Sequence, residues 1–299
     1  MKKITLTIIA LSVSLAHADF EIKELPGKYI DVLDGEKVVA RVMTEHDKAT
    51  AESRHETYKV YTHVFDEQGK APITKGAGGQ FTHHRGIFIG WSKTKFSGKQ
   101  VDSWHMKGCD QIYKKIINST STKDQATLTI LIHWVTTDGV VFIEENRTQA
   151  FKRVEGEGAY LQVDFDTALK AASADVELNG DPEHAGCQFR PSNEVSKNKS
   201  AKYIFHKDGL DLKKDKDLPW AAESFQIGEN MYFAQHMSHP TIPKGNTYSA
   251  YRDYGRFGAY FVKKITKGDS LNLRYRYLVG NGKIPSRDYF ASRYEAFSN

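Results

Sequence analysis

The chain has 299 residues, of which 42 are basic and 37 acidic, so its formal net charge is only +5. This mild balance does not indicate a nucleic-acid partner. After an N-terminal export signal, roughly 280 residues remain without an internal repeat, a Pro/Ser-rich linker or a further long apolar run, which indicates one large domain.

The first predicted element is a secretory signal over residues 1–18. Two lysines precede an apolar run over residues 4–15, and Ala16-His17-Ala18 supplies the small residues of a cleavage site. The apolar run is too short to span a bilayer. We therefore expect cleavage after Ala18, a single mature β-sandwich domain over residues 19–299, and a periplasmic or secreted location.

Short segments with alternating polarity and many β-branched or aromatic residues follow. They predict strands over residues 28–33, 37–43, 58–65, 87–89, 111–118, 126–136, 140–147, 160–169, 174–178, 221–227, 231–236, 258–264 and 270–279. Asp34-Gly35 and Asp138-Gly139 fit two-residue hairpin turns. Only residues 285–297 are expected to form a substantial helix. The pattern predicts an all-β fold, a large antiparallel β-sandwich.

Titratable residues gather in four places along these strands and loops. The groups are His83-His84-Arg85 with His105; His133 with Glu144 and Glu145 across the second hairpin; residues 181–190 with His184 and Arg190; and residues 236–258 with His239, Arg252, Tyr254 and Arg256. Buried imidazole and guanidinium groups must be paired or hydrated, so packing alone seldom explains them. We expect the four groups to converge on one polar cleft that binds a ligand.

The pair His83 and His84 precedes an apolar, strand-like run. Because adjacent residues of a strand point to opposite faces, only one of the two is expected to reach the cleft, and we favour His84. Arg190 shares a face with Gln188 and suits a carboxylate or sulfate clamp.

Three kinds of chemistry compete for these residues. A divalent metal stays open, although no cofactor is required and no His-x-His or His-x-x-x-His spacing is present. Nucleophilic hydrolysis by a serine or cysteine is disfavoured, because the sequence has no strand–nucleophile–helix elbow. Separately, Cys109 and Cys187 could form a disulfide in an oxidising compartment. Proton abstraction next to a carbonyl needs a base, a neutralising cation and a proton donor, and histidine, arginine and tyrosine supply all three.

Three motifs carry a family resemblance: His83-His84-Arg85-Gly86, residues 181–190 and residues 252–258. Together they resemble a domain-of-unknown-function family that is often automatically labelled "methane oxygenase PmoA-like" and is associated with carbohydrate degradation. The resemblance implies a β-sandwich related to galactose mutarotase and to polysaccharide-lyase sandwich domains. The oxygenase label conflicts with the sequence, because a membrane oxygenase subunit needs long apolar spans.

The expected function is a carbon–oxygen lyase or dehydratase that acts on uronic-acid or keto-sugar oligosaccharides, so the expected partner is an anionic or oxidised oligosaccharide. His84, His105 or His133 would be the base, Tyr254 the proton donor, and Arg85 or Arg190 the neutralising cation. The expected substrate-binding residues are His83, Arg85, Glu144, His184, Arg190, His239, Arg252 and Arg256.

Two alternatives stay open. A glycoside hydrolase would need two carboxylates about 5 to 10 Å apart, for which Glu144 and either Glu183 or Asp181 are candidates. A non-catalytic glycan-binding protein would expose tryptophans on a flat face. The four tryptophans are Trp91, Trp104, Trp134 and Trp220.

Overall fold

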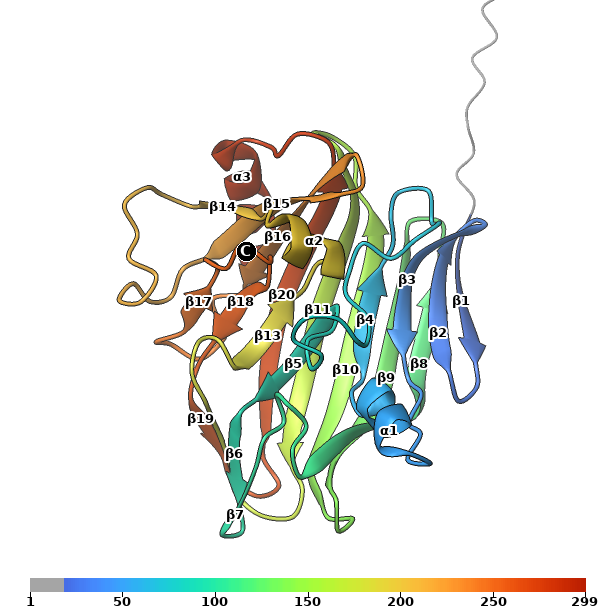
Figure 1. Ribbon diagram of the computed structural model, residues 1–299, viewed down its shortest axis with the longest axis vertical. Coiled ribbons are helices and arrows are strands. Elements are labelled where there is room, and N and C mark those ends of the chain that lie inside the picture. Colours follow the sequence, from blue (N-terminus) through green and yellow to red (C-terminus); the bar gives the residue numbers. More distant parts are fainter. Residues whose placement is uncertain (1–18) are drawn as a thin grey trace, which may run out of the picture.

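The computed structural model describes residues 19–299, and the expected signal over residues 1–18 lies outside the described residues. The described part forms two eight-stranded sheets and one four-stranded sheet (Figure 1). All neighbouring strands in them are antiparallel.

The first sheet has the order β1 (Phe20–Leu25), β2 (Tyr29–Asp34), β3 (Lys37–Met43), β4 (Tyr61–Val64), β5 (Ile87–Trp91), β13 (Ala185–Phe189), β18 (Phe257–Tyr260) and β17 (Thr247–Ser249). The second has the order β14 (Lys202–Phe205), β15 (Trp220–Ile227), β16 (Asn230–Ser238), β20 (Ser270–Asn281), β11 (Ala159–Ala171), β10 (Val141–Arg153), β9 (Gln125–Thr136) and β8 (Cys109–Ser121). The small sheet has the order β19 (Lys263–Ile265), β12 (Val176–Asn179), β6 (Lys93–Phe96) and β7 (Lys99–Val101). The helices are α1 (Ala51–Thr57), α2 (Asn193–Asn198) and α3 (Arg287–Ser298).

The two large sheets share one apolar core. Ile89 and Phe189 of the first sheet belong to the same buried cluster as Phe165 and Tyr277 of the second. Figure 1 shows β4, β5 and β13 lying over β10 and β11 of the second sheet. Because each sheet buries one face against the other, the expected antiparallel β-sandwich is confirmed.

Alternating polarity forms the long strands of the second sheet. In β9, every second residue from Ala126 to Thr136 is buried, and the residues between them are partly exposed. The same alternation extends β10 and β11 to Arg153 and Ala171, beyond their expected ends. Continuous alternation keeps one face of each strand on the core over its whole length.

Both predicted hairpins form, but their turns differ from the expected ones. Asp34 pairs with Lys37, so the first turn is Gly35-Glu36, with Gly35 at φ 61°. The second connection spans residues 137–140, between the ends of β9 and β10. The predicted neighbours His133 and Glu144 do pair across this hairpin.

The predicted C-terminal helix is α3, the longest helix in the described part of the chain. The side chain of Ser286 caps its first turn by accepting the backbone N–H of Tyr289. Phe290 and Phe297 pack with Trp220 and other buried residues of β15, β16 and β20. The helix therefore covers the outer face of one half of the second sheet.

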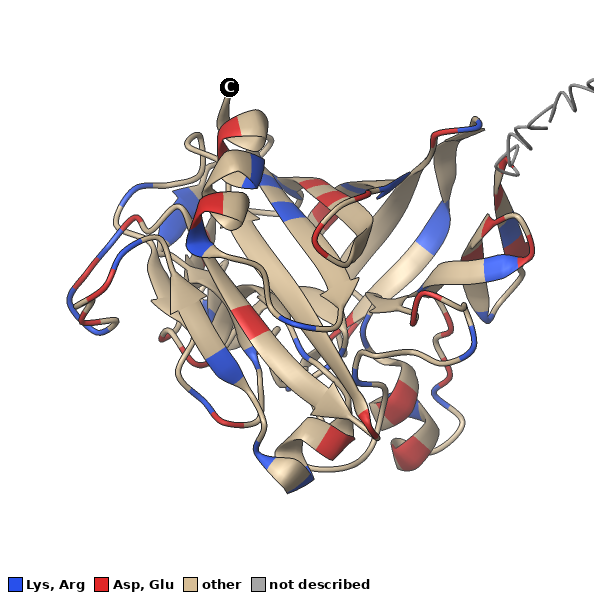
Figure 2. Cartoon of the chain, turned by 90° about the horizontal axis from the view of Figure 1, so that it is seen from above, with Lys and Arg blue, Asp and Glu red and all other residues tan. Residues whose placement is uncertain are grey.

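Figure 2 shows charged residues on loops and helices and also along strands. The central strands β11 and β20 of the second sheet carry Asp164, Asp166, Arg274 and Arg276. Within residues 19–299, no helix has both the length and the hydropathy to cross a bilayer.

Candidate functional site

The pair His83 and His84 lies in a turn before β5, not on the strand. The backbone N–H of His84 donates to the carbonyl of Phe81 at 2.9 Å, and Phe81 has a left-handed φ of 54°. Both imidazole rings lie side by side, with centroids 4.4 Å apart. The expectation that strand alternation brings only one of them to the site is wrong. His84, the favoured base, is only 2% exposed, and His83 is the more accessible ring.

His105 and Asp102 form a hydrogen-bonded dyad in the loop after β7. Nδ1 of His105 lies 2.7 Å from Oδ2 of Asp102, whose Oδ1 accepts the backbone N–H groups of Trp104 and His105 at 3.1 and 2.8 Å. Burial opposes ionisation of Asp102, but hydrogen bonds from His105 outweigh it and hold the pKa of Asp102 below its ordinary value. The contact keeps the proton of the neutral ring on Nδ1, which leaves Nε2 free to accept one.

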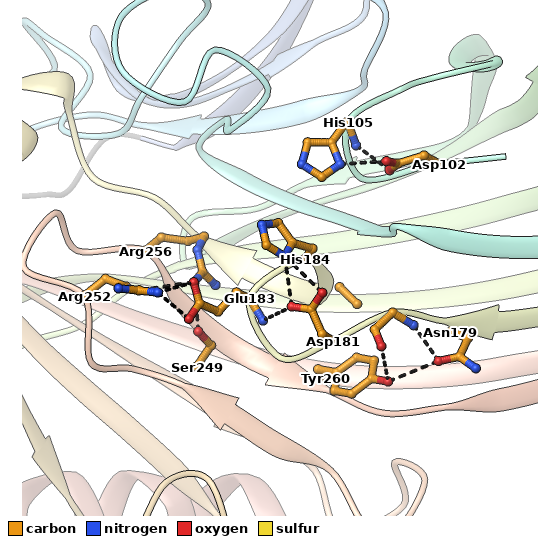
Figure 3. Close-up of polar contacts among 12 residues, drawn as sticks. Asp102, His105, Asn179, Asp181, Glu183, His184, Ser249, Arg252, Arg256 and Tyr260 are labelled. Carbon is orange, nitrogen blue, oxygen red and sulfur yellow. Dashed lines mark hydrogen bonds and ion pairs between the residues drawn. The ribbon is translucent and has the colours of Figure 1, made fainter.

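A second dyad of the same construction lies before β13. Nδ1 of His184 is 2.9 Å from Oδ1 of Asp181, and the backbone N–H of His184 donates to the Asp181 carbonyl at 3.0 Å. Figure 3 shows the two dyads, which enter the site from different loops. The rings of His105 and His184 have centroids 5.3 Å apart. Two oriented imidazoles therefore lie next to each other.

Ring contacts join His84, His83, His105 and His184 into one series, which we call the histidine row. Neighbouring centroids are 4.4, 4.2 and 5.3 Å apart. Burial lowers the pKa of His83 to about 2, and the charges of Lys59, His105 and His184 act in the same direction. His83 is therefore a neutral member of the row at physiological pH.

Part of the histidine row lines a cleft of about 420 Å³ beside α1. The lining residues are Arg54, His55, Tyr58, Thr82, His83, His105, Met106, Lys107, Gly108 and Thr137. None of them is acidic. Nη2 of Arg54 is 2.5 Å from Asp110, whereas Lys107 is exposed and forms no ion pair within the described part. The cleft is large enough for a small ligand and favours a negatively charged one.

Five cations are buried around the histidine row and none is more than 1% exposed: Lys59, Lys75, Arg85, Arg190 and Arg256. Their donors contact carbonyls or neutral side chains. Lys59, for example, donates to the carbonyls of His83 and Trp104 at 3.1 and 2.7 Å. Among residues 19–299 none of the five forms an ion pair, and Nε of each arginine has no hydrogen-bond partner. Burial lowers the pKa of Lys75 to about 7 and the pKa of Lys59 well below its ordinary value. The positive charge available to stabilise negative charge at the site therefore rests mainly on the three arginines.

Glu223, a fully buried acid near Arg190, does not form an ion pair with these cations in the described part of the chain. Burial raises the pKa of Glu223 well above its ordinary value, against the attraction of Arg190. Burial also lowers the pKa of His84 well below its ordinary value, with Arg256 as the next cause. The shift of Glu223 removes a negative charge from the region, and the shift of His84 favours its neutral ring.

The structure changes the expected role of the arginines. Arg85 and Arg190 are 0% exposed, so their guanidinium groups do not face solvent as a clamp would. Arg85 donates to the backbone of Thr82 and His84, because the turn before β5 folds around it. Burial lowers the pKa of Arg190 to about 10. Because they are buried, these groups can influence a ligand in the cleft only through their electric field.

The loop over residues 250–256 is tied to the second dyad. Nε of Arg252 lies 3.1 Å from Oε2 of Glu183, its Nη2 lies 2.5 Å from Oε1, and the hydroxyl of Tyr251 donates to Oε1 at 2.9 Å. Figure 3 shows Glu183 between Arg252 and the His184 dyad. Tyr254, on the same loop, packs against Phe81 with ring centroids 4.7 Å apart. The ion pair therefore joins the loops that carry His184 and Tyr254.

Three predicted residues do not join this site. His133 and Glu144 lie opposite each other on β9 and β10, on the face of the second sheet that points away from the first. Glu144 pairs with Lys170 there, at 3.6 Å. His239 lies beyond β16 near α3, where its ring is 5.2 Å from Phe297. The expectation that all four groups converge is wrong for these residues, because alternation turns them outward or the chain has passed to the other side of the sandwich.

Several open alternatives can be compared with the structure. The four tryptophans are at most 1% exposed, so they form no flat binding face. Cys109 and Cys187 are both unpaired and buried. In the described part of the chain, no three His, Cys, Asp or Glu side chains are arranged to bind one metal ion.

Sequence reasoning missed Asp102 as the partner of His105 and gave Lys59 and Phe81 no role. The two dyads share the spacing Asp-x-x-His, in Asp102-Ser-Trp-His105 and in residues 181–184. This repeated spacing was the available signal. Lys59 carries no local signal, because only the fold brings its side chain under the turn before β5.

The fold and the site define an all-β sandwich protein with a histidine-rich surface site bordered by buried cations. The chain belongs to a family of unknown function, DUF6807, whose model matches residues 29–294. The expected membership of an unknown-function family is thus confirmed, and nothing in the comparisons supports the oxygenase label. No protein with a curated description matches the sequence.

Solved structures with a similar fold are distant. A heparan sulfate lyase HepC mutant from Pedobacter heparinus has 9% identity and a TM-score of 0.45 over 88% of this chain, and the match covers 37% of that protein. A putative kojibiose phosphorylase from the human microbiome has 10% identity and a TM-score of 0.31 over 87% of this chain, with 31% of that protein covered. The chain therefore spans about a third of the length of these proteins.

Proposed function

We propose that this protein is an exported carbohydrate-active enzyme, a carbon–oxygen lyase that acts on oligosaccharides containing uronic acid. The observation that carries the proposal is the pair of Asp–His dyads, whose rings lie 5.3 Å apart among cations without acidic partners. Elimination next to a carboxylate needs a base, an acid and stabilisation of an enolate, and this arrangement offers all three. The choice of a sugar as substrate rests on the family resemblance.

His105 is the base in this proposal, because it lines the cleft and Asp102 orients it. Its Nε2 removes the proton from the carbon next to the carboxylate, and the C–H electron pair becomes the new C=C bond. The C–O bond to the leaving group breaks, and the leaving oxygen takes a proton from the imidazolium of His184. The products are an unsaturated uronate and an alcohol, without any change of redox state.

The proton donor is thereby reassigned from Tyr254 to His184. Ring contacts place Tyr254 against Phe81 and His84, with centroids 4.7 and 6.1 Å apart. In the described part, Tyr254 has no ring contact with either dyad, whereas His184 is next to the base. Tyr254 is therefore a substrate-binding residue in this proposal.

The proposed lyase activity is tested by incubating the purified protein with uronic-acid and keto-sugar oligosaccharides, with and without chelator. The masses and the ultraviolet absorbance of the products are then measured. Elimination gives an absorbing product whose mass shows cleavage without addition of water. His105→Gln should lower the rate about 100- to 10,000-fold, while His133→Gln on the outer face should match the parent. Cleavage that adds water and gives no absorbance would instead favour a hydrolase.

Export is part of the proposal and has its own test. Expression of the full chain in a bacterial host should give a periplasmic protein whose intact mass corresponds to a mature N-terminus at Asp19. Retention of residues 1–18 in the purified protein would contradict it.

A further inference from the structure

Exposed aromatic side chains are concentrated at the proposed site. Among residues 19–299, the large apolar side chains that are exposed are Leu25, Phe81, Ile117, Val140, Met231, Tyr251 and Val262. Only Phe81 and Tyr251 are aromatic, and each is 38% exposed. Both belong to loops that border the histidine row. An exposed aromatic ring beside a polar site indicates a binding surface more strongly than a scattered aliphatic residue does.

Phe81 also has an unfavourable backbone conformation. Its φ is 54°, in the left-handed region that costs an ordinary residue about 1 to 2 kcal/mol. Gly78 and Gly79, just before it, adopt positive φ values without that cost. The chain thus keeps a large ring at a position where glycine would be favoured for conformation alone. Strain of this kind is typical of residues held in place for binding.

The neighbours of Phe81 hold its ring over the site. Its centroid is 4.7 Å from Tyr254 and 5.3 Å from His84. Tyr254 is itself supported by Arg190, whose guanidinium carbon lies 4.9 Å from the centre of the Tyr254 ring. The turn that carries Phe81 is closed by the hydrogen bond from His84. One side of the ring is therefore fixed by packing, while more than a third of the residue stays open to solvent.

We propose that Phe81 is a stacking platform for a pyranose ring of the substrate, next to the histidine row. A pyranose ring presents an apolar C–H face, which packs on an aromatic face, and hydroxyl groups at its edge, which need polar partners. Arg252, Glu183 and His184 supply such partners on the adjoining loops. This inference rests on the proposed function for its ligand class, but it concerns binding and not the chemical step.

The test separates the ring from the backbone strain. Phe81→Ala and Phe81→Gly both remove the ring, but only glycine relieves the left-handed φ. Phe81→Trp keeps an aromatic face. Binding is measured by calorimetry with galacturonic-acid and mannuronic-acid tetrasaccharides as probes, and thermal stability is measured for each variant. Glu157→Gly, at an exposed residue with φ 52° on a distant turn, is the matched control for relief of strain.

We expect the alanine and glycine variants to lose affinity equally, at least about tenfold, although the glycine variant is the more stable. The tryptophan variant and Glu157→Gly should bind like the parent. If Phe81→Gly bound the probes as tightly as the parent, Phe81 would not be a stacking platform. The same conclusion would follow if the affinities of the variants rose and fell with their thermal stabilities. Binding without turnover would refute the lyase and leave the platform standing, while a parent that binds neither probe would overturn both.

Discussion

The imidazole rings of His105 and His184 lie 5.3 Å apart, and in each ring Nδ1 contacts an aspartate three residues earlier in the chain. In the proposed elimination one ring acts as the base and the other as the acid, so the two rings must be in opposite protonation states when the substrate reacts. The rate should consequently show a bell-shaped dependence on pH.

Substrates with different leaving groups can distinguish the proposed base, His105, from the proposed acid, His184. His105→Gln should lower kcat/KM about 100-fold or more on every substrate, because the base is needed whatever group leaves. His184→Gln should do so on an oligosaccharide, yet should regain most of the activity on a uronate with an aryloxy leaving group, which needs no proton. The measurement is kcat/KM for the two substrates.

Asp102→Asn and Asp181→Asn test the aspartates that orient the two histidines. Each should lower kcat/KM on the same substrates as the variant of its partner histidine, but by a smaller factor. If both histidine variants recovered equally with the aryloxy substrate, the assignment of base and acid would be wrong.

Buried neutral histidines predict that the protein loses stability in mild acid. Burial lowers the pKa of His63 to about 4 and that of His236 to about 3. In the unfolded chain both titrate near pH 6.5, so below that pH the unfolded state binds more protons than the folded state. Their contribution is complete above about pH 6.5 and is lost as the pH falls toward the folded values. Together they should lower the free energy of unfolding by up to about 3 kcal/mol per pH unit near pH 5.

Urea unfolding between pH 7.5 and 4.5 measures this slope. His83 and His84 add to the slope in the same direction. His63→Gln should reduce it by about 1.4 kcal/mol per pH unit, while His133→Gln, at a partly exposed position, should change it much less. An equal slope in His63→Gln and the parent would contradict the account.

The sequence predicted the sandwich better than it predicted the site. Alternation over β9 determined which residues face the core, and the same alternation could have excluded His133, because it lies between the buried residues Ile132 and Trp134. The turn of His83 and His84 could not be predicted by this means, since it depends on the left-handed Phe81 and on the buried Arg85 around which the backbone folds. Side chains placed by long-range contacts, such as Lys59 beneath Trp104, leave no periodic signal.

An ion pair in the core is expected to matter for stability. Glu145 and Arg147 are both fully buried, with Nε of Arg147 at 2.8 Å from Oε1 of Glu145. Glu145 also accepts hydrogen bonds from Trp134 and Thr167 at 2.8 and 2.9 Å. Arg147→Met leaves the carboxylate buried without its cation, so it should lower the free energy of unfolding by about 3 to 5 kcal/mol.

Denaturant unfolding of Arg147→Met, Glu145→Gln and the double variant measures this effect. The double variant should be more stable than Arg147→Met, because it leaves no charge unpaired. If it were less stable than either single variant, the loss would come from packing and not from the isolated charge.

The ion pair between Arg252 and Glu183 is expected to affect binding more than stability. Both side chains are partly exposed, and such pairs contribute only about 0 to 1 kcal/mol to folding. The pair nevertheless joins the loop of His184 to the loop of Tyr254, so Arg252→Ala should free both loops and raise KM several-fold while the melting temperature changes little. Arg287→Ala, which breaks a similar exposed pair with Asp208, is the control and should leave KM unchanged.

A fall in kcat at unchanged KM would show that the pair aligns the catalytic rings and not the substrate-binding loops. An equal rise in KM for both variants would show that the effect is not specific to the site.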